Sequence, residues 1–426
     1  MKCVIINNDE KSDGMKNIDK LQEKYAKVLL KTCLGIKKGE QLFISASNEI
    51  LPFVRVVAKV AYENGVKEIY FDLTDPYLKH DALLNLEVKD LKKLQFWNKE
   101  AWNRYAKSGA AFLMLVSETP GLMKDVLPKK LSDMTVYGFD TRKEFDDLRA
   151  KSIVPWCIAA VPTEIWAKEV FPKSEDAVGD LWDSIFDICQ INKKDPEVVW
   201  NDKIKRLTKR CEKLNAYHFK SLRYTNSLGT DFTIDLPEKH LWASGREKLA
   251  DGRSVLVNFP TEEVFTSPTN DSAEGILYAS KPLCYQDNII QDFWIQFHKG
   301  KVVACKASRG EDTLKQIIES VKNADRLGEV ALVPYNSPIS EANLVFYETL
   351  YDENASCHVA LGDSFPECIL GGVKMSKEEL KKYKMNTCSN HVDFMIGTKD
   401  LCIVGICPNG KEVSIFEKGN FTREFE

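Results

Sequence analysis

The stretch from residue 41 to 73 constrains the fold more than any other part of this chain. It opens with the apolar run QLFISAS at 41–47, which is typical of a buried strand. Apolar residues at helical spacing follow at 51–65, LPFVRVVAKVAYENG, and the closing Asn-Gly pair predicts the end of a helix. A second strand is predicted at 66–73, VKEIYFDL. A strand, a helix and a strand within about 30 residues form a βαβ unit, which requires a parallel strand pair and a right-handed crossover.

The rest of the first half continues this alternation of strands and helices. Three more apolar runs of strand length follow, at 110–118, 134–141 and 156–162. Two long helical patterns come after them, at 176–191 and 198–217. We therefore predict an α/β N-terminal domain with a mostly parallel sheet over residues 15–210, after a short polar extension at 1–14.

The character of the chain changes near residue 215. Short strands with alternating polarity dominate from there, and helical stretches are fewer, with one at 311–325. We place the domain boundary between 195 and 220, with the polar stretch Lys193–Pro196 as a candidate linker. The sequence then predicts an α+β C-terminal domain over residues 211–426.

Composition and charge exclude several classes of protein. The 426 residues include 59 basic and 63 acidic side chains, so the chain lacks the basic excess of a general nucleic-acid binder. No run approaches 18 apolar residues, so we predict no membrane span. The apolar run Cys3–Ile6 is too short for a signal peptide, which favours the cytoplasm. The twelve cysteines show no C-x-x-C pair, and we interpret them as small buried hydrophobic residues rather than disulfides or zinc ligands.

Nucleotide-binding motifs are weak. The stretch GICPNGK at 405–411 starts like a phosphate-binding loop, but Glu412 stands where a magnesium-binding Ser or Thr is needed. Pro-Asn-Gly between two strands is instead typical of a hairpin turn. No G-x-G-x-x-G follows a strand in the α/β half, so a nucleotide-binding protein is only a third interpretation, which nucleotide titration would test.

The stretch HVDFMIG at 391–397 places an imidazole and a carboxylate side by side. Residues two apart on a strand face the same side, so His391 and Asp393 share the edge of an apolar core. For this pair alone, an ion pair is the simpler explanation, because buried charges occur in pairs.

Further acidic and imidazole residues stand where other apolar strands begin. Adjacent Glu262 and Glu263 interrupt the apolar run at 257–268, and an extended chain would turn at least one of them inward. Glu329 leads directly into the strand VALV. Glu353 precedes His358 by five residues, which a loop could bring together but a continuous helix could not.

These residue types favour a metal site in the C-terminal domain. Carboxylate oxygens with a minority of imidazoles suit zinc, manganese or cobalt. Four carboxylates and two imidazoles exceed one tetrahedral site, and they suit two ions that share a bridging carboxylate and hydrolyse a substrate with a metal-activated water.

The residues around these positions are similar to those of the thermophilic metallo-aminopeptidase family, the relatives of aminopeptidase T and aminopeptidase S. The resemblance covers about residues 15–422. In the first half it includes IKKGEQLFI and VRVVAKVAYENGVKEIYFDLTDP. In the second half it is more specific and includes NSLGTDFTIDLP, FPTEEVFTSP, SKPLCYQ, LGEVALVPYNSPIS, FYETLYDENASCHVALG and HVDFMIG.

This resemblance implies a ligand set, an activity and an assembly. The implied metal ligands are Glu263, Glu329 as the bridge, Glu353, His358, His391 and Asp393. They imply two divalent ions per chain, zinc, cobalt or manganese, in the C-terminal domain. The implied activity is the release of N-terminal amino acids from small peptides. As the carboxylate that also handles the proton, we favour Glu329 or Glu353. The family resemblance also implies a homodimer whose active sites open into an internal cavity.

One position departs from the family pattern. In GDSFPE this chain has Phe365 where the relatives carry a tyrosine that is thought to hydrogen-bond the reacting centre. Phenylalanine cannot donate that bond, so one electrostatic contribution to the transition state is expected to be absent. The stretch 381–390 also looks longer than in the relatives. A catalytically impaired family member that binds metal or peptide as a scaffold is therefore the alternative hypothesis.

Overall fold

The computed structural model describes residues 8–94, 96–285 and 288–426, and the chain forms two compact units. The first comprises the residues up to 120 with 126–201 and 248–259, and the second comprises 121–125, 202–247 and 260–426. The boundary placed at residue 210 from the sequence lies inside helix α10 (Pro196–Tyr217). The first unit takes in 248–259 because β10 (Asn258–Phe259) pairs in parallel with one of its strands.

The N-terminal residues differ from the predicted polar extension at 1–14. Residues 8–14 belong to helix α1 (Asn8–Lys27), and residues 1–7 lie outside the described chain. Tyr25, near the end of α1, is fully buried and contacts Phe53 and Phe259, so the first unit packs against this helix.

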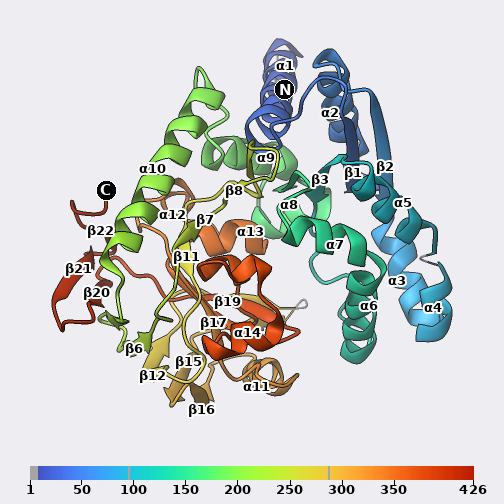
Figure 1. Ribbon diagram of the computed structural model, residues 1–426. Helices are drawn as coiled ribbons and strands as arrows, with labels where there is room; N and C mark the ends of the chain where they lie inside the picture. The colour runs from blue at the N-terminus through green and yellow to red at the C-terminus, as the bar shows by residue number, and fades with distance from the viewer. Residues whose placement is uncertain (1–7, 95, 286–287) are drawn as a thin grey trace, which may run out of the picture. The chain divides into compact units, whose positions relative to one another are not determined.

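The first unit contains a five-stranded parallel sheet in the order β10-β4-β3-β1-β2 (Figure 1). Its remaining strands are β1 (Gln41–Ser47), β2 (Glu68–Thr74), β3 (Ala111–Val116) and β4 (Trp156–Ala160). Helix α2 (Leu51–Glu63) connects β1 to β2, which confirms the predicted βαβ unit. The expected parallel sheet is likewise confirmed.

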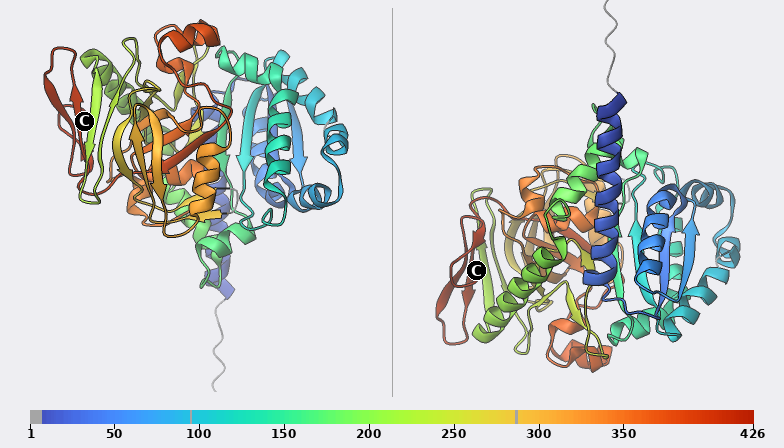
Figure 2. Two further views of the ribbon diagram at one scale, coloured as in Figure 1. Left: turned by 90° about the horizontal axis from the view of Figure 1, so that it is seen from below. Right: turned by 90° about the horizontal axis from the view of Figure 1, so that it is seen from above.

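Helices cover both faces of this sheet (Figure 2). The other helices of the unit are α3 (Pro76–Asn85), α4 (Val88–Leu94), α5 (Phe96–Lys107), α6 (Pro128–Thr141), α7 (Lys143–Ala150), α8 (Glu164–Val170) and α9 (Ala177–Ile188). On one face Phe43 packs against Phe112, with Trp102 from α5 and Phe145 from α7 completing an aromatic cluster.

This sheet buries a carboxylate of its own. Asp72 on β2 is only 8% exposed, and its carboxylate accepts a hydrogen bond from the indole Nε1 of Trp102 at 2.7 Å. Burial raises the pKa of Asp72, which favours the neutral acid. A single buried acid in this sheet is therefore satisfied by one neutral donor.

The strand predicted at 134–141 is wrong. These residues form the second half of α6. Leu131, Met134, Tyr137 and Thr141 recur every three or four residues, and Met134 and Thr141 are buried. That spacing is helical, so the apolar face formed over several turns outweighs the strand propensity of the short run TVYGF.

The second unit is built mostly from antiparallel strands (Figure 1). An eight-stranded sheet has the order β16-β15-β12-β6-β5-β20-β21-β22. Its strands are β5 (Ser221–Thr225), β6 (Asp231–Asp235), β12 (Glu274–Tyr278), β15 (Trp294–His298), β16 (Lys301–Lys306), β20 (Cys402–Ile406), β21 (Glu412–Glu417) and β22 (Asn420–Phe421). Cys407 N donates to Lys411 O at 2.9 Å between β20 and β21, so GICPNGK is a hairpin and not a phosphate loop.

A five-stranded antiparallel sheet in the same unit has the order β19-β18-β17-β11-β7. Its strands are β7 (Ala243–Ser244), β11 (Val264–Thr266), β17 (Leu327–Leu332), β18 (His358–Gly362) and β19 (His391–Met395). One face packs into the core through Val330, Val359 and Phe394. Because side chains alternate along a strand, the residues between them lie on the opposite face.

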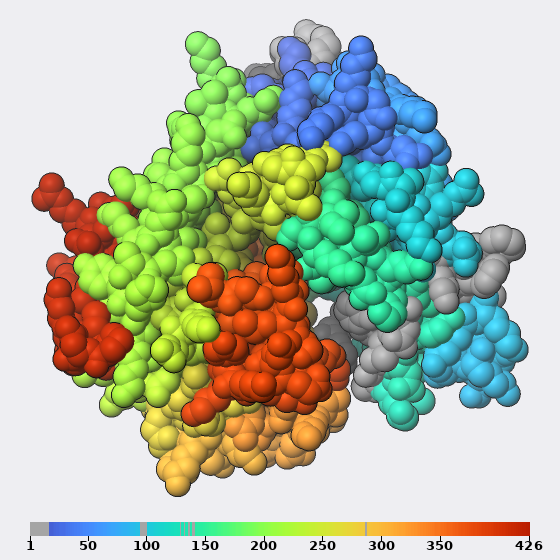
Figure 3. Space-filling model, in the orientation of Figure 1, coloured from blue at the N-terminus to red at the C-terminus, as the bar shows by residue number. Residues whose placement is uncertain are grey.

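Helices and short strands complete the second unit. The helices are α11 (Glu311–Glu319), α12 (Pro338–Glu341), α13 (Thr349–Asp352) and α14 (Lys377–Lys382). A small hairpin pairs β13 (Leu283–Tyr285) with β14 (Asn288–Ile290). Between β18 and β19 the chain forms an orange-red layer at the molecular surface that includes α14 (Figure 3).

Two expectations from composition concern the whole chain. Among the described residues, no helix combines the length and the apolar character needed to cross a membrane. Many of the cysteines that the structure describes are buried, as predicted for small core residues.

Candidate metal centre

Strand register brings acidic residues together on the second face of the five-stranded sheet. Glu329 on β17 lies opposite Ala360 on β18, and Ala360 lies opposite Asp393 on β19. The three residues thus form one row across three strands. Alanine is small, so the longer side chains of Glu329 and Asp393 can approach each other above it.

His391 lies beside this row, two residues before Asp393 on the edge strand β19. Its Nε2 lies 3.1 Å from Glu329 Oε2 and 3.4 Å from Asp393 Oδ1. The ligand atoms of Glu329, His391 and Asp393 all lie within 4.8 Å of one another. The predicted contact between His391 and Asp393 is therefore present, with Glu329 as a third member.

A second group meets at the start of β18. His358 Nε2 lies 3.2 Å from Oε2 of Glu263, the residue immediately before β11. Glu263, His358 and Glu329 offer ligand atoms within 4.8 Å of one another. Glu329 belongs to both groups, which is the arrangement expected of a bridging carboxylate.

Backbone carbonyls orient both imidazoles. His358 Nδ1 lies 3.1 Å from Ser356 O, and His391 Nδ1 lies 2.9 Å from Asp363 O. A carbonyl oxygen can only accept, so Nδ1 carries the proton in each ring. The Nε2 lone pair of a neutral ring therefore faces the carboxylates, as in histidines that bind metals.

The pKa values show how strongly these groups interact. Burial opposes protonation of His358, but the Glu263 carboxylate outweighs it and raises the pKa of His358 to about 10. Burial also opposes protonation of His391, yet Asp393 and Glu329 raise its pKa well above the usual range. Burial raises the pKa of Glu329 to about 7. For Asp393, burial works against the charged form, but His391 holds its pKa below the usual value.

Glu353 stands apart from these two groups. It begins the 3-10 turn Glu353–Ala355 ahead of β18, keeps some exposed surface, and is a member of neither group. Desolvation by the surrounding side chains, together with the negative charges of Asp393 and Glu263, raises the pKa of Glu353 well above the usual range. Among the described contacts, no direct bond joins Glu353 and His358, which were predicted to converge. The two residues interact through charge, because His358 lowers the pKa of Glu353.

Glu262 differs in role from its neighbour Glu263. Both are buried, but the carboxylate of Glu262 pairs with Lys203 of α10. The Glu262 N–H donates to Asn354 Oδ1 at 2.8 Å, and Asn354 Nδ2 contacts Glu353 Oε1 at 3.4 Å. This network fixes the segments that carry Glu263 and Glu353. Sequence reasoning missed Lys203, because nothing in a helical pattern marks which lysine is buried.

Phe365 lies directly beside the candidate centre. The centroid of its ring is 5.0 Å from that of His391 and 5.3 Å from that of Phe265. Its backbone N–H donates to Ser267 Oγ at 2.9 Å. The position where a tyrosine is expected is therefore close to the predicted ligands, and this chain presents a phenyl ring there.

The donor set fits divalent ions that prefer oxygen and nitrogen ligands. The two groups contain carboxylates and imidazoles, and they lack thiolates. With Glu353, the candidate ligands comprise four carboxylates and two imidazoles. Zinc, manganese and cobalt accept such ligands.

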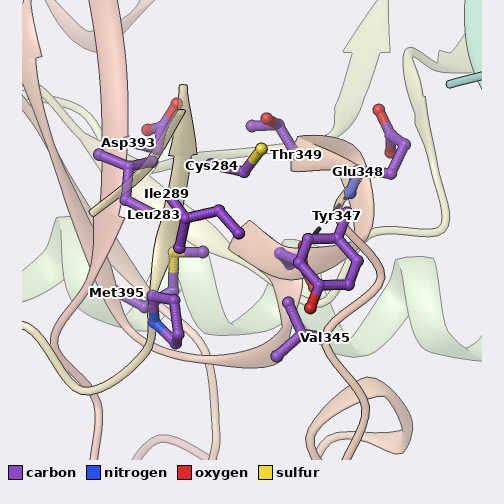
Figure 4. Close-up of a pocket in the computed structure, with 11 residues that line it drawn as sticks. Leu283, Cys284, Ile289, Val345, Tyr347, Glu348, Thr349, Asp393 and Met395 are labelled. Atoms are coloured by element: carbon purple, nitrogen blue, oxygen red, sulfur yellow. Dashed lines mark hydrogen bonds between the residues drawn. The ribbon is translucent and has the colours of Figure 1, made fainter. Parts of the chain in front are cut away.

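A pocket adjoins this centre within the second unit. Its empty volume is about 390 Å³, including space open to solvent, and Asp393 contributes to its lining. Asp393 and Met395 lie on one side of it, and Val345 and Tyr347 lie on the other (Figure 4). Sequence reasoning missed this pocket, because its walls come from three separate segments.

An α/β unit joined to an antiparallel unit with buried carboxylates and imidazoles around a shared glutamate is typical of a metal-dependent hydrolase. The profile of the thermophilic metalloprotease family (M29) matches residues 18–421. The chain therefore belongs to the M29 family, which confirms the resemblance found in the sequence and the enzyme class that it implied.

Individual relatives agree with this assignment. The chain is 38% identical to Aminopeptidase 2 from Geobacillus stearothermophilus, over 96% of this chain and 100% of the relative. It is 37% identical to Aminopeptidase AmpS from Bacillus subtilis, over 93% of this chain and 97% of the relative. The solved structure of wild-type AmpT from Thermus thermophilus superimposes with a TM-score of 0.87 at 31% identity, over 96% of this chain and 99% of that one.

Proposed function

We propose that this chain is a metal-dependent aminopeptidase that releases N-terminal amino acids from small peptides. The observation that carries the proposal is the position of Glu329, whose carboxylate belongs to both groups of candidate ligands. A carboxylate shared in this way suits two neighbouring ions better than one. The names of the relatives, which are aminopeptidases, support the substrate class.

The proposed ligands divide between two ions, zinc, cobalt or manganese. Glu263 and His358 would hold one, His391 and Asp393 would hold the other, and Glu329, which belongs to both groups, would serve both, with Glu353 as a further candidate ligand. When bound, such ions lower the pKa of a water molecule and polarise the scissile carbonyl. Four ionised carboxylates would carry the charge that balances two divalent cations, and the cations would displace the protons that the raised pKa of Glu353 favours.

Glu353 is the better placed of the two proposed proton carriers. Hydrolysis adds the water oxygen to the carbonyl carbon, breaks the C–N bond and transfers a proton from the water to the departing amine. Glu329 is engaged by His391, while Glu353 is in neither group and keeps some exposed surface. A carboxyl group whose pKa is raised can accept the water proton and return it to the amine.

The substitution Glu329→Gln tests this proposal. The amide keeps the size of the side chain but loses its charge, so we expect the bound metal to fall below two ions per chain. Cleavage of amino-acid amides should fall by about 100-fold or more, since the bridge serves both ions. The matched control is Asp72→Asn, which also neutralises a buried carboxylate but should leave both quantities unchanged. Unaltered metal content with unaltered activity in Glu329→Gln would contradict the assignment.

A catalytically impaired scaffold is the second candidate function. Phe365 favours it, because its phenyl ring lies 5.0 Å from the His391 ring and offers no hydroxyl group to a reacting carbonyl. In that case the chain would bind metal and peptide with little turnover. Absence of turnover with two ions bound would support this candidate over the enzyme.

The assembly and the cellular location also remain predictions. The family resemblance implies a homodimer, which light scattering of the purified protein would measure. The cytoplasmic location inferred from the N-terminal sequence would be tested by fractionation.

A further inference from the structure

The pocket beside the candidate metal centre continues along the strand that carries two of the proposed ligands. Asp393 and Met395 are two residues apart on β19, so both face the same side, and both line the pocket. Asp393 therefore contacts the proposed metal group and the pocket at once. A substrate whose reacting carbonyl lies at the metal group would have its nearest side chain beside this pocket.

The remaining walls are mostly apolar. Leu283 and Ile289 come from the hairpin β13–β14, Val345 comes from the chain before α13, and Met395 closes the opposite side (Figure 4). These side chains offer no hydrogen bond to a ligand. An aliphatic group placed among them would be removed from water on several sides, which stabilises binding in proportion to the apolar area buried.

The acidic residues in the lining are already engaged or directed elsewhere. Asp352 accepts hydrogen bonds from Phe346 N at 2.8 Å and from Glu348 N at 3.2 Å. Asp393 contacts His391. Glu348 extends away from Leu283 and Met395 (Figure 4). Asp352 and Asp393 therefore have partners within the chain, and the other walls described above are apolar.

Tyr347 is held in an unusual backbone conformation at the pocket wall. Its φ is 55°, in the left-handed region that L side chains rarely adopt. The carboxylate of Asp352 binds the N–H groups on either side of Tyr347, and this clamp keeps the tyrosine at the pocket. A strained residue held by a buried carboxylate beside a candidate active site indicates a functional constraint.

The size of the pocket limits what it can hold. Its empty volume of about 390 Å³ includes the open entrance. The enclosed part is smaller, because this figure counts space that is open to solvent. One side chain fits such a space better than a run of several residues.

We propose that this pocket is the subsite for the side chain of the residue released from the peptide's N-terminus. It selects an unbranched or γ-branched apolar side chain of the size of leucine or methionine, with Val345 and Tyr347 as its walls and Asp352 as a positioning residue. The proposal rests on the aminopeptidase function proposed above.

Filling the pocket with Val345→Phe tests the proposal. In the metal-loaded wild-type protein, kcat/KM for a leucyl p-nitroanilide should exceed that for the lysyl compound by about 10-fold or more. Val345→Phe should lower kcat/KM for the leucyl substrate by about 10-fold and change the alanyl substrate by less than about threefold. The control is Val303→Phe, the same substitution at a 57% exposed position of β16, which should change neither.

Binding provides a readout that does not depend on turnover. Calorimetric titration with L-leucine and L-alanine should show that Val345→Phe loses leucine binding, while Val303→Phe retains it. If Val345→Phe does not fold, Val345→Ala should instead raise kcat/KM for a phenylalanyl substrate relative to the leucyl one. Asp352→Asn should raise KM for the leucyl substrate with kcat and metal content retained, since a positioning role acts on the pocket wall.

The outcomes separate the two proposals. Equal losses for leucyl and alanyl substrates in Val345→Phe, unchanged values for both, or a wild-type preference for lysine would overturn the subsite assignment and leave the aminopeptidase function standing. A wild-type protein that holds two ions and cleaves no substrate would overturn the aminopeptidase function. Leucine binding that Val345→Phe abolishes would in that case still support the subsite.

Discussion

The two five-stranded sheets of this chain bury carboxylates in different ways. The parallel sheet of the first unit buries Asp72 and satisfies it with the neutral N–H of Trp102. The antiparallel sheet of the second unit brings Glu263, Glu329 and Asp393 together with imidazoles as their partners. Burial alone therefore does not distinguish a structural acid from a candidate metal ligand.

The distinguishing quantity is the balance of charge. Burial raises the pKa of the lone acid Asp72, while the hydrogen bond from Trp102 and the charge of Arg142 act in the opposite direction. Several carboxylates in contact share two imidazoles, and burial raises the pKa of Glu329 and of Glu353, so the metal-free cluster holds protons that bound cations would displace. The first sheet is complete as it stands, whereas the second has a place for cations.

Metal removal should give the largest effect, and only in the second sheet. Chelation should abolish activity and lower the free energy of unfolding by about 4 kcal/mol for each ion present at 1,000 times its Kd. Hydrogen exchange should show faster exchange of the amides in β17, β18 and β19, with β1 and β3 unchanged. Re-addition of zinc, cobalt or manganese should restore protection. Equal loss of protection in both sheets would contradict the distinction between them.

The metal-free protein should become less stable as pH rises. Glu329 has its pKa raised from 4.5 to about 7, and His358 has its pKa raised from 6.5 to about 10. The folded state binds more protons than the unfolded state across these ranges. The stability that Glu329 contributes is therefore fully present below about pH 4.5, and that of His358 below about pH 6.5. This contribution to the free energy of unfolding, on the order of a few kcal/mol, is lost as pH rises through 7 for Glu329 and through 10 for His358.

Urea unfolding at a series of pH values measures this dependence. His358→Gln is the control, because it removes one of the two imidazoles whose raised pKa values cause the change above pH 6.5, so the dependence on pH should become shallower. The metal-loaded protein should show a flatter profile there, since a ligated Nε2 has no proton to lose. A metal-free profile that rises toward pH 10 would show that the imidazoles are not protonated partners of these carboxylates.

The fold could be predicted from the sequence where the hydrophobic pattern extended over many residues. The βαβ unit at 41–73 combined two strands with a full helix, and all three elements are present. The error at 134–141 came from a short run whose helical face extends back to Leu131. The segment 248–259 could not be assigned to the first unit, because its pairing with β4 is a contact between distant parts of the chain.

The sequence predicted contacts of the site only between residues that are close together in the chain. The i, i+2 spacing of His391 and Asp393 placed them side by side, and the structure shows that contact. The row through Glu329, Ala360 and Asp393 depends on strand register, which no local pattern reveals. The pocket likewise needs three segments to meet, so its residues carried no signal in the sequence.

The smallest predicted effect tests whether the carboxylates and imidazoles are enough for turnover without a hydroxyl donor at position 365. Phe365→Tyr adds one hydroxyl group to a partly exposed ring beside His391. A donor near the reacting carbonyl should raise kcat/KM for a leucyl p-nitroanilide by about 10-fold, with metal content unchanged. The control is Phe265→Tyr, which adds the same group to a ring 5.3 Å from Phe365 and should have no such effect.

Phe365→Tyr and Phe265→Tyr together distinguish the contribution of the metal ligands from that of a hydroxyl donor at position 365. A gain confined to Phe365→Tyr means that the carboxylates and imidazoles build a working centre whose rate is limited by one missing donor. Equal gains in both variants would mean that a general change in polarity is responsible. The scaffold is favoured if neither the wild type nor Phe365→Tyr shows turnover while each binds two ions. The carboxylates and imidazoles would then hold metal although the protein does not hydrolyse peptide.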